Sequence, residues 1–536
     1  MHRALRALLA LPVFATFTAL AGDAAAPAFP YEEATVAELQ AEMRAGRLTS
    51  RALTEAYLAR IREVDPQLRS VLEVNPDALA IADALDAERK AKGPRGPLHG
   101  IPVLVKDNIA TADRMQTTAG SLALLGVRPP RDAAVIERLR AAGAVLLGKT
   151  NLSEWANIRS SRSSSGWSAR GGQCRNPYAL DRTPCGSSSG TGAAIAANLA
   201  TVGVGTETDG SIVCPSSSQS LVGLKPTVGL VSRSGIVPIS STQDTAGPMG
   251  RSVADVAALL SAMAGADASD AATAASKGKA AADYTTFLEA GGLKGARIGV
   301  VRAKAFGSSP ATDRALETAI AVLKAKGAVV VDPVEIPHLG EYDDAELDVL
   351  LTEMKAGLAD YLKEWAPGAP VKSLEELIAW NREHAAREMP YFGQELFEQA
   401  AKKGPLTSPE YRKSLEKCRK LALDEGLAAV FGGQKLDALV APTGGLPWVI
   451  DLVTGDHFGM SSSTPPAVAG TPAITVPAGF ERGLPVGITF MGPAWSEGKL
   501  LKLAYSYEQA TRARRPPRLA QGADLELTLS GDVRKQ

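Results

Sequence analysis

The pattern of apolar and polar positions alternates between amphipathic helical stretches and short apolar runs. From 36 to 92 the chain is Ala-rich, and Leu39, Met43 and Leu53 belong to a series of apolar residues at helical spacing. Asp132 is expected to cap a helix that ends at Gly143. Strands are predicted at 101–105, 144–147, 296–301, 328–331, 438–441, 473–476 and 486–490, and helices at 132–142, 252–264, 312–326, 341–430 and 499–512. This alternation predicts an α/β layered fold.

The first residues have the pattern of a secretory signal peptide. A short basic start is followed by an apolar run over 7–20 and by Ala19-Leu20-Ala21, a small-x-small cleavage pattern. The alternative is a retained membrane anchor, but a span needs about 20 apolar residues. The organisation predicted is a signal peptide at 1–21, a loose leader at 22–35, a single domain at 36–515 and a tail at 516–536. We therefore expect a periplasmic or secreted protein.

The charge balance and the cysteine content bear on the binding partners and on the disulfides that the chain can have. Lys and Arg together equal Asp and Glu at 58 each, which favours neither nucleic acid nor an anionic membrane as partner. No Cys/His spacing indicates zinc. We expect a monomer without metal or other cofactor. Export makes a disulfide possible. Cys174 and Cys185 are the nearest pair, although sequence cannot give the connectivity, and Cys214 is expected only to pack in its apolar segment.

Residues 153–250 are rich in Gly, Ser and Thr, and they raise the question of a serine nucleophile. A Ser hydroxyl needs a neighbour that takes its proton. The five His residues are isolated in sequence, which favours a base other than His. Lys106 closes the apolar strand at 101–105, and burial there would disfavour its ammonium form. The alternative for Lys106 is a structural ion pair, for example with Asp107.

The segment Thr208-Asp209-Gly210-Ser211 has the composition of an oxyanion-binding turn. Backbone N–H groups aimed at a developing oxyanion stabilise tetrahedral intermediates, and Gly210 allows the dihedral angles of a tight turn. The alternative is a flexible Gly/Ser loop, but the segment is flanked by apolar runs and Pro.

Three long motifs make the chain resemble the amidase signature family of Ser–Ser–Lys hydrolases, and within it the bacterial peptide amidases. They are Val103–Asn108, Arg175–Gly192 and Gly205–Pro215. Asp209 and Cys185 each stand where the family pattern has Gly. The resemblance implies the amidase signature fold, a large twisted mixed β-sheet covered by helices on both faces.

The resemblance also implies roles for single residues. Ser211 takes the position of the nucleophile, Ser187 that of a bridging serine held by a cis peptide, and Lys106 that of the base. The backbone of Thr208, Asp209, Gly210 and Ser211 would bind the oxyanion. Ser188 and Asp244 would support the site from behind, and for Asp244 a turn cap is an equal alternative.

The implied function is that of a serine amidase, a hydrolase of linear carboxamide C–N bonds other than peptide bonds. It would act through a Ser-linked acyl-enzyme on a small-molecule or peptide amide, and convert peptide C-terminal amides to carboxylate and ammonia. Aryl amides, oligoamides or esters are alternative substrates, and the helices of 341–430 are expected to line the substrate pocket.

Two alternatives from other classes remain. Gly186-Ser187-Ser188-Ser189-Gly190 also matches the nucleophile elbow of an α/β-hydrolase, with Ser188 as nucleophile and His457 or His384 as base. The elbow requires a preceding strand, and Thr183-Pro184 is a poor candidate for one. The other alternative is a non-catalytic binding protein. Lys149 and Lys225 are expected to position loops, and His99 is expected to be a loop or core residue.

Overall fold

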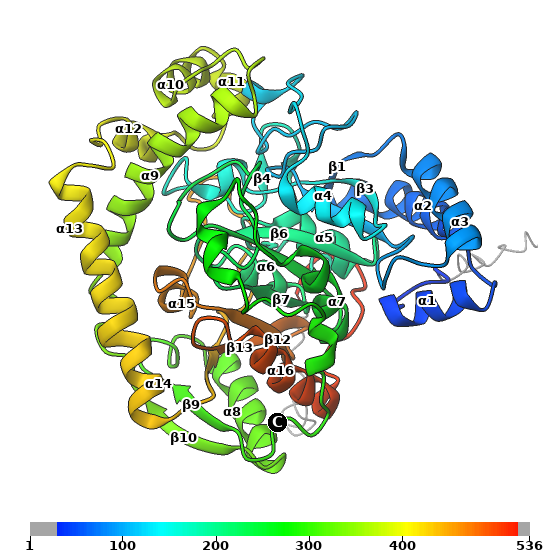
Figure 1. Ribbon diagram of the computed structural model, residues 1–536. Coiled ribbons are helices and arrows are strands. Elements are labelled where there is room, and N and C mark those ends of the chain that lie inside the picture. Colours follow the sequence, from blue (N-terminus) through cyan, green and yellow to red (C-terminus); the bar gives the residue numbers. More distant parts are fainter. Residues whose placement is uncertain (1–28, 524–536) are drawn as a thin grey trace, which may run out of the picture. The chain divides into compact units, whose positions relative to one another are not determined.

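The computed structural model describes residues 29–523, and the chain divides into two units, Met1–Glu32 and Glu33–Gln536. All named helices and strands lie in the second unit, and Figure 1 shows their arrangement. The predicted signal peptide at 1–21 lies outside the described residues, as do most of the leader and the end of the tail.

A mixed sheet of eleven strands forms the centre of the second unit. Three neighbouring strands towards each flank are paired parallel, whereas the strands in the middle, and one edge strand with its only neighbour, are paired antiparallel. In spatial order they are β1 (Val71–Val74), β3 (Val145–Thr150), β2 (Pro102–Lys106), β6 (Val202–Glu207), β8 (Thr245–Gly250), β7 (Val222–Lys225), β12 (Ala473–Glu481), β13 (Leu484–Met491), β11 (Ala438–Pro442), β9 (Arg297–Val301) and β10 (Val329–Val334). A separate hairpin pairs β4 (Trp167–Ser168) with β5 (Gly172–Gln173).

Helices flank this sheet (Figure 1). Their bounds are α1 (Val36–Arg44), α2 (Ser50–Leu68), α3 (Ala78–Lys92), α4 (Ala134–Ala141), α5 (Ser189–Ala196), α6 (Val213–Ser218), α7 (Val253–Met263), α8 (Pro310–Ala325), α9 (Asp343–Glu364), α10 (Leu374–Glu383), α11 (Ala385–Glu388), α12 (Glu395–Ala401), α13 (Pro409–Cys418), α14 (Ala429–Gln434), α15 (Thr464–Val468) and α16 (Glu497–Thr511). A π-helix, Arg419–Ala428, connects α13 to α14.

Helices cover both faces of the sheet, as two closely packed glycines show. A Cβ atom added to Gly203 of β6 would lie 2.6 Å from Thr191 of α5. One added to Gly250 of β8 would lie 3.2 Å from Val256 of α7. Gly250 pairs with Val202, the neighbour of Gly203 along β6. Because neighbouring residues of a strand face opposite sides, α5 and α7 cover opposite faces, and the predicted mixed sheet between helical layers is confirmed.

Two local expectations were wrong. The stretch 36–92 is not entirely helical, because the four residues of β1 leave the helical path and pair antiparallel with β3. Asp132 does not cap α4, whose N-cap is Ala133. The Asp132 carboxylate instead accepts a hydrogen bond from the backbone N–H of Ala112 at 2.7 Å and pairs with Arg140. Ser252 does cap α7, and its side chain accepts a bond from Asp255 N–H.

Within residues 29–523, no helix combines the length and apolar character needed to cross a bilayer. The same residues contain no group of three or more His, Cys, Asp or Glu side chains placed to hold a metal ion.

Candidate active site

The amine of Lys106 lies at the end of β2, fully buried. Its Nζ donates hydrogen bonds to the hydroxyl of Ser187 at 2.7 Å, to the hydroxyl of Thr206 at 2.9 Å and to the carbonyl of Thr206 at 3.3 Å. The alternative of an ion pair with Asp107 is not realised, because the Asp107 carboxylate pairs with Arg170 at 2.9 Å. The amine therefore contacts uncharged oxygens.

Burial dominates the protonation of this amine. Desolvation lowers the pKa of Lys106 to about 7, and the charges of Asp244 and Glu207 act in the opposite direction. The uncharged amine is therefore a populated form at neutral pH, unlike that of an exposed lysine. An uncharged amine has a lone pair that can accept a proton.

Ser187 lies just before α5, next to the N-cap Ser188. The Gly186–Ser187 peptide is cis, as the family resemblance implies, and the carbonyl of Ser187 accepts a bond from Ser153 N–H at 3.1 Å. The Ser187 side chain is fully buried. Its hydroxyl is therefore shielded from bulk water and in contact with the Lys106 amine.

Ser211 ends the turn between β6 and α6 and lines a cavity of about 370 Å³. Among the described residues, the backbone N–H groups of Asp209, Gly210 and Ser211 have no hydrogen-bond acceptor. Gly210 has φ +79°, a left-handed conformation, and a Cβ atom there would lie 2.9 Å from the Ser463 hydroxyl. The turn thus requires glycine, and its free N–H groups are available to bind an oxyanion.

Two half-buried carboxylates hold this turn from behind. Asp244 accepts a bond from the Thr208 hydroxyl at 2.6 Å and also from the N–H groups of Ile239 and Ser240, so it both supports the turn and caps another one. Asp209 accepts bonds from the hydroxyls of Ser463 and Thr464, at the start of α15.

Glu207 completes this support at the first turn of α6. Its carboxylate accepts bonds from the N–H groups of Ile212 at 2.7 Å and Val213 at 3.0 Å. Hydrogen bonds therefore hold the segments immediately before and after Ser211, the candidate nucleophile.

A backbone hydrogen bond joins the two segments that carry Ser187 and Ser211. Ser188 N–H donates to the carbonyl of Ser211 at 3.2 Å. In the described part of the chain the hydroxyls of Ser187 and Ser211 are not bonded to each other, and the Ser211 hydroxyl has no other partner. Hydrogen bonds of this kind commonly tighten only when substrate is bound.

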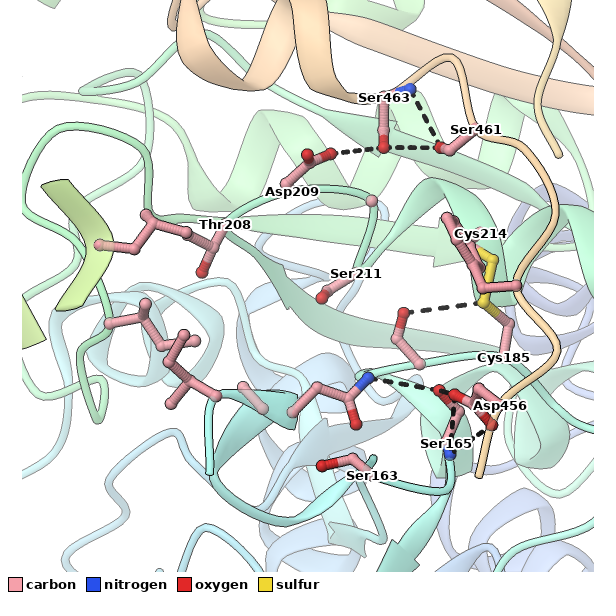
Figure 2. A pocket seen from close by; sticks show the side chains of 18 of the residues that line it. Ser163, Ser165, Cys185, Thr208, Asp209, Ser211, Cys214, Asp456, Ser461 and Ser463 are labelled. Atoms are coloured by element: carbon pink, nitrogen blue, oxygen red, sulfur yellow. Dashed lines mark hydrogen bonds between the residues drawn. A yellow bond between two sulfur atoms is a disulfide. The ribbon is translucent and has the colours of Figure 1, made fainter. Parts of the chain in front are cut away.

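The cavity at Ser211 is formed by segments far apart in sequence. Figure 2 shows Ser211 in its centre, with Thr208 and Asp209 on one side and the disulfide between Cys185 and Cys214 on the other. From the region 341–430, the lining includes Leu350 of α9. No cationic side chain is part of the lining among the described residues.

The expectation for Cys214 was wrong. Cys214 does not merely pack; it forms a disulfide with Cys185, with a Cα–Cα distance of 5.9 Å. Cys174 and Cys418 are free and buried. Sequence proximity favoured Cys174, but folding brings the start of α6 next to the residue that precedes Gly186.

Ser188 occupies a different environment from that of a nucleophile. Its hydroxyl donates to the carbonyl of Thr206 at 3.0 Å and accepts from Thr206 N–H at 3.2 Å, so it holds α5 against the end of β6. His457 is bonded to Asp451, and His384 stacks on Trp380. No His contacts Ser188 within the described residues, and the nucleophile-elbow alternative has no base here.

Three further residues were expected to be structural. Lys149 donates to the carbonyl of Ile109 at 2.6 Å, and Lys225 donates to the carbonyl of Thr471 at 2.7 Å. His99 is buried and its ring contacts the carbonyl of Leu85 at 2.9 Å. These contacts fit loop and core positions.

Sequence reasoning missed Thr206, Ser463 and Thr464. Thr206 contacts Lys106 directly, and its hydroxyl also accepts from the Asn108 amide at 3.0 Å. Thr206 lies inside the third motif, but nothing in the sequence distinguishes it from the neighbouring Thr208. Ser463 and Thr464 belong to a segment without a recognisable motif, and only the fold brings them to Asp209.

Known proteins resemble this chain over most of its length. The family model described as Amidase matches residues 52–501. A probable amidase of Arabidopsis thaliana is 43% identical over 499 residues, which are 91% of this chain and 92% of the relative. The crystal structure of the native peptide amidase from Stenotrophomonas maltophilia is 54% identical, with a TM-score of 0.88, over 92% of this chain and 99% of that chain.

A crystal structure of the peptide amidase PAM with the competitive inhibitor chymostatin is 55% identical, with a TM-score of 0.89, over 91% of this chain and all of that chain. The matched range of the family model contains Lys106, Ser187 and Ser211. The chain therefore belongs to the amidase family and is a hydrolase of amide bonds.

Proposed function

We propose that this amidase removes the amide nitrogen from the C-terminus of peptides, with Ser211 as nucleophile, Ser187 as bridging serine and Lys106 as base. The observation that carries the proposal is the buried Lys106 amine at 2.7 Å from the Ser187 hydroxyl. The similarity to peptide amidases over nine-tenths of the chain supports the choice of substrate.

Acylation begins when uncharged Lys106 takes the proton of Ser187, which in turn takes the proton of Ser211. The Ser211 oxygen then forms a bond to the amide carbon, and the carbonyl oxygen becomes an oxyanion. The free N–H groups of Asp209, Gly210 and Ser211, whose turn lines the cavity, bind this oxyanion in the proposed mechanism. The proton returns through Ser187 to the amide nitrogen, the C–N bond breaks, and ammonia leaves.

Deacylation uses the same groups with water in place of the amide. Water loses a proton to the Ser187–Lys106 pair and attacks the ester carbon. The bond to Ser211 breaks, and Ser211 regains its proton. The product is a peptide with a C-terminal carboxylate, and the cavity lining described above offers this anion no cationic side chain, which favours its release.

The proposal is tested with an amidated peptide and the same peptide as free acid. Mass spectrometry should detect the replacement of NH₂ by OH only in the amidated peptide, with one equivalent of ammonia released and internal peptide bonds intact. Ser211→Ala should abolish this conversion. Ser163→Ala is the matched control, because Ser163 lines the same cavity and has no part in the proposed relay.

Two results would contradict the proposal in different ways. A folded enzyme that leaves amidated peptides unchanged but hydrolyses aryl amides or esters through Ser211 would refute the peptide substrate alone. Normal turnover by folded Ser211→Ala would refute the proposed site.

We also propose that the protein is exported to the periplasm or secreted and acts there as a monomer. The Cys185–Cys214 disulfide supports export, because disulfides persist mainly in oxidising compartments. N-terminal sequencing of protein from periplasmic and extracellular fractions should find a chain that begins after Ala21. Intact protein in the cytoplasm would contradict export.

A further inference from the structure

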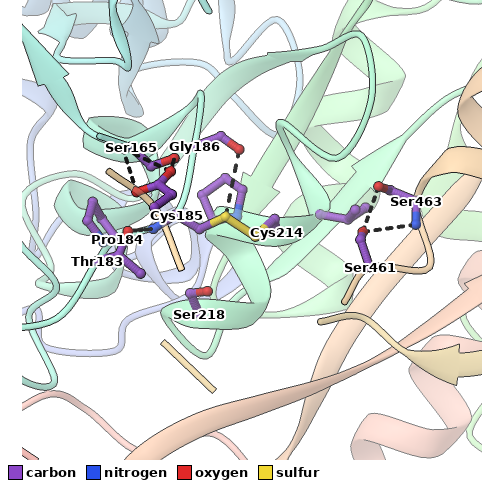
Figure 3. Close-up of a disulfide and its surroundings, with 12 residues drawn as sticks. Ser165, Thr183, Pro184, Cys185, Gly186, Cys214, Ser218, Ser461 and Ser463 are labelled. Atoms are coloured by element: carbon purple, nitrogen blue, oxygen red, sulfur yellow. Dashed lines mark hydrogen bonds between the residues drawn. A yellow bond between two sulfur atoms is a disulfide. The ribbon is translucent and has the colours of Figure 1, made fainter. Parts of the chain in front are cut away.

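The disulfide joins the two segments that carry the serines. Cys185 lies two residues before Ser187, and Cys214 lies three residues after Ser211, although the cysteines are 29 positions apart in sequence. Figure 3 shows the bond between the segment of Pro184, Cys185 and Gly186 and the helix that carries Cys214 and Ser218. One covalent bond thus connects the approach to α5 with the first turns of α6.

Both ends of the bond are fixed to the backbone around the serines. Cys185 N–H donates to the Thr183 hydroxyl at 3.0 Å, and its carbonyl accepts from the Ser189 hydroxyl at 2.6 Å. Cys214 N–H donates to the carbonyl of Gly210 at 2.8 Å, within the oxyanion turn. A displacement of either sulfur therefore reaches the neighbouring serine through few rotatable bonds.

The other links between the two segments are hydrogen bonds. Ser188 N–H donates to the carbonyl of Ser211 at 3.2 Å, and the Gln219 amide donates to the carbonyl of Pro184 at 3.0 Å. Since the hydroxyls of Ser187 and Ser211 are not bonded to each other among the described residues, their separation is set by the backbones that carry them. The disulfide is the strongest of these restraints.

We propose that the Cys185–Cys214 disulfide is a positioning element for proton transfer between Ser187 and Ser211, so that its reduction lowers amidase activity in the folded enzyme. The inference rests on the proposed roles of the two serines. A dithiol reductant supplies two electrons and two protons: the S–S bond breaks, Cys185 and Cys214 become thiols, and the dithiol closes to its own disulfide. Oxidation by a disulfide reagent reverses the step.

The expected effect follows from the distance dependence of the reaction. A misplacement of about 1 Å can lower a rate by about a hundredfold, but the hydrogen bonds made by Ser188 and Gln219 still join the segments after reduction. We therefore expect kcat to fall roughly ten- to a hundredfold, with a smaller change in KM, because proton transfer depends on alignment more than substrate binding does.

The first experiment reduces the folded wild-type enzyme with dithiothreitol and counts free thiols by alkylation and mass spectrometry. kcat, KM and the rate at which a fluorophosphonate labels Ser211 are measured well below the melting temperature. The variant Cys174→Ala/Cys418→Ala is the matched control, since it keeps the disulfide and removes the two free thiols. It should lose activity on reduction as the wild type does, and reoxidation should restore both.

The second experiment replaces the pair, as Cys185→Ala/Cys214→Ala and as Cys185→Ser/Cys214→Ser. Circular dichroism and a cooperative melting curve establish that each variant is folded. In a folded variant, fluorophosphonate labelling of Ser211 and turnover of the substrate should be as slow as in the reduced wild type.

A wild-type rate in the reduced enzyme or in a folded variant, even with a lower melting temperature, would overturn the proposal, because the bond would then only stabilise the fold. Resistance to reduction combined with unfolded variants would overturn it as well. The rate of labelling at Ser211 does not depend on the proposed substrate. If the wild type is labelled at Ser211 but leaves amidated peptides intact, the proposed substrate is wrong. The labelling rates of the oxidised and reduced enzyme still test the role of the disulfide.

Discussion

Lys106 and Lys149 lie on neighbouring strands of the sheet, and both amines are fully buried. The register of β2 and β3 pairs Lys106 with Thr150 and Val105 with Lys149. Because side chains alternate along a strand, the two amines point to opposite faces. Thr150 contacts Thr191 of α5 at 2.7 Å, so Lys106 lies on the face that α5 covers and Lys149 lies on the other.

Burial alone does not distinguish these lysines. Desolvation is the largest cause of the lowered pKa of both amines, to about 7 for Lys106 and about 8 for Lys149. The contacts differ: Lys106 meets the hydroxyls of Ser187 and Thr206, whereas Lys149 meets the Thr117 hydroxyl and the Ile109 carbonyl. A buried amine is a candidate base only where the hydroxyl that it contacts belongs to a serine near a second serine. On the face covered by α5, Ser187 is the serine in contact with Lys106, and Ser211 is the second serine.

The largest expected effect separates the two lysines directly. Lys106→Met should lower kcat/KM by a factor on the order of 10⁴ or more, because it removes the proposed base. Lys149→Met should lower kcat/KM by no more than about tenfold, while it destabilises the fold by about 1–3 kcal/mol. It removes the bonds of the amine to the Ile109 carbonyl and the Thr117 hydroxyl, and it leaves these two groups only their mutual bond at 3.4 Å. Activity per folded molecule and melting curves test both. Equal losses of activity would refute the distinction between the two faces.

The pH dependence gives the next largest effect. Lys106 accepts a proton only when uncharged, so kcat/KM should fall about tenfold per pH unit below the pKa of about 7 and level off above it. This fall is the acidic limb of the pH profile. Lys149→Met should show the same limb when kcat/KM is measured with an uncharged amide substrate. A limb that is absent from the wild type, or that moves with Lys149→Met, would contradict the assignment of the base to Lys106.

Much of the fold was predictable because it depends on local patterns. Apolar runs indicated β2, β3, β9, β11 and β13, and a serine indicated the start of α7. The strand β1 was missed because its four residues follow a long helix and become a strand only by pairing with β3. The order of strands in the sheet depends on long-range pairing and left no local signal.

The candidate site divides in the same way. Lys106, Ser187 and Ser211 were identified from motifs, and folding brings the first two into contact. The partners of Cys185 and Asp209 could not be found, since Cys214 and Ser463 approach them only through tertiary packing. Motifs therefore indicated which residues act, and packing determines what holds them in place.

A smaller effect is expected at Thr206, which belongs only to the Lys106 side of the comparison. Thr206→Val removes a hydroxyl that accepts bonds from Lys106 and Asn108, and should lower kcat about tenfold, the value of one such bond. That oxygen stabilises the ammonium form, so its loss should lower the pKa of Lys106 and move the limb to lower pH. Thr206→Ser should retain both kcat and the limb. A shift to higher pH would contradict this argument.

The smallest effect on activity is expected at Ser188, on the same face as Lys106. Its hydroxyl bonds to both backbone groups of Thr206, so Ser188→Ala should cost about 1–2 kcal/mol of stability and leave kcat within a few-fold of wild type. Chemical denaturation and steady-state kinetics measure the two quantities separately. A nucleophile at Ser188 requires the opposite result, complete loss of turnover in a protein as stable as wild type. This variant therefore distinguishes the proposed site, in which Ser187 contacts Lys106, from a site in which the adjacent Ser188 is the nucleophile.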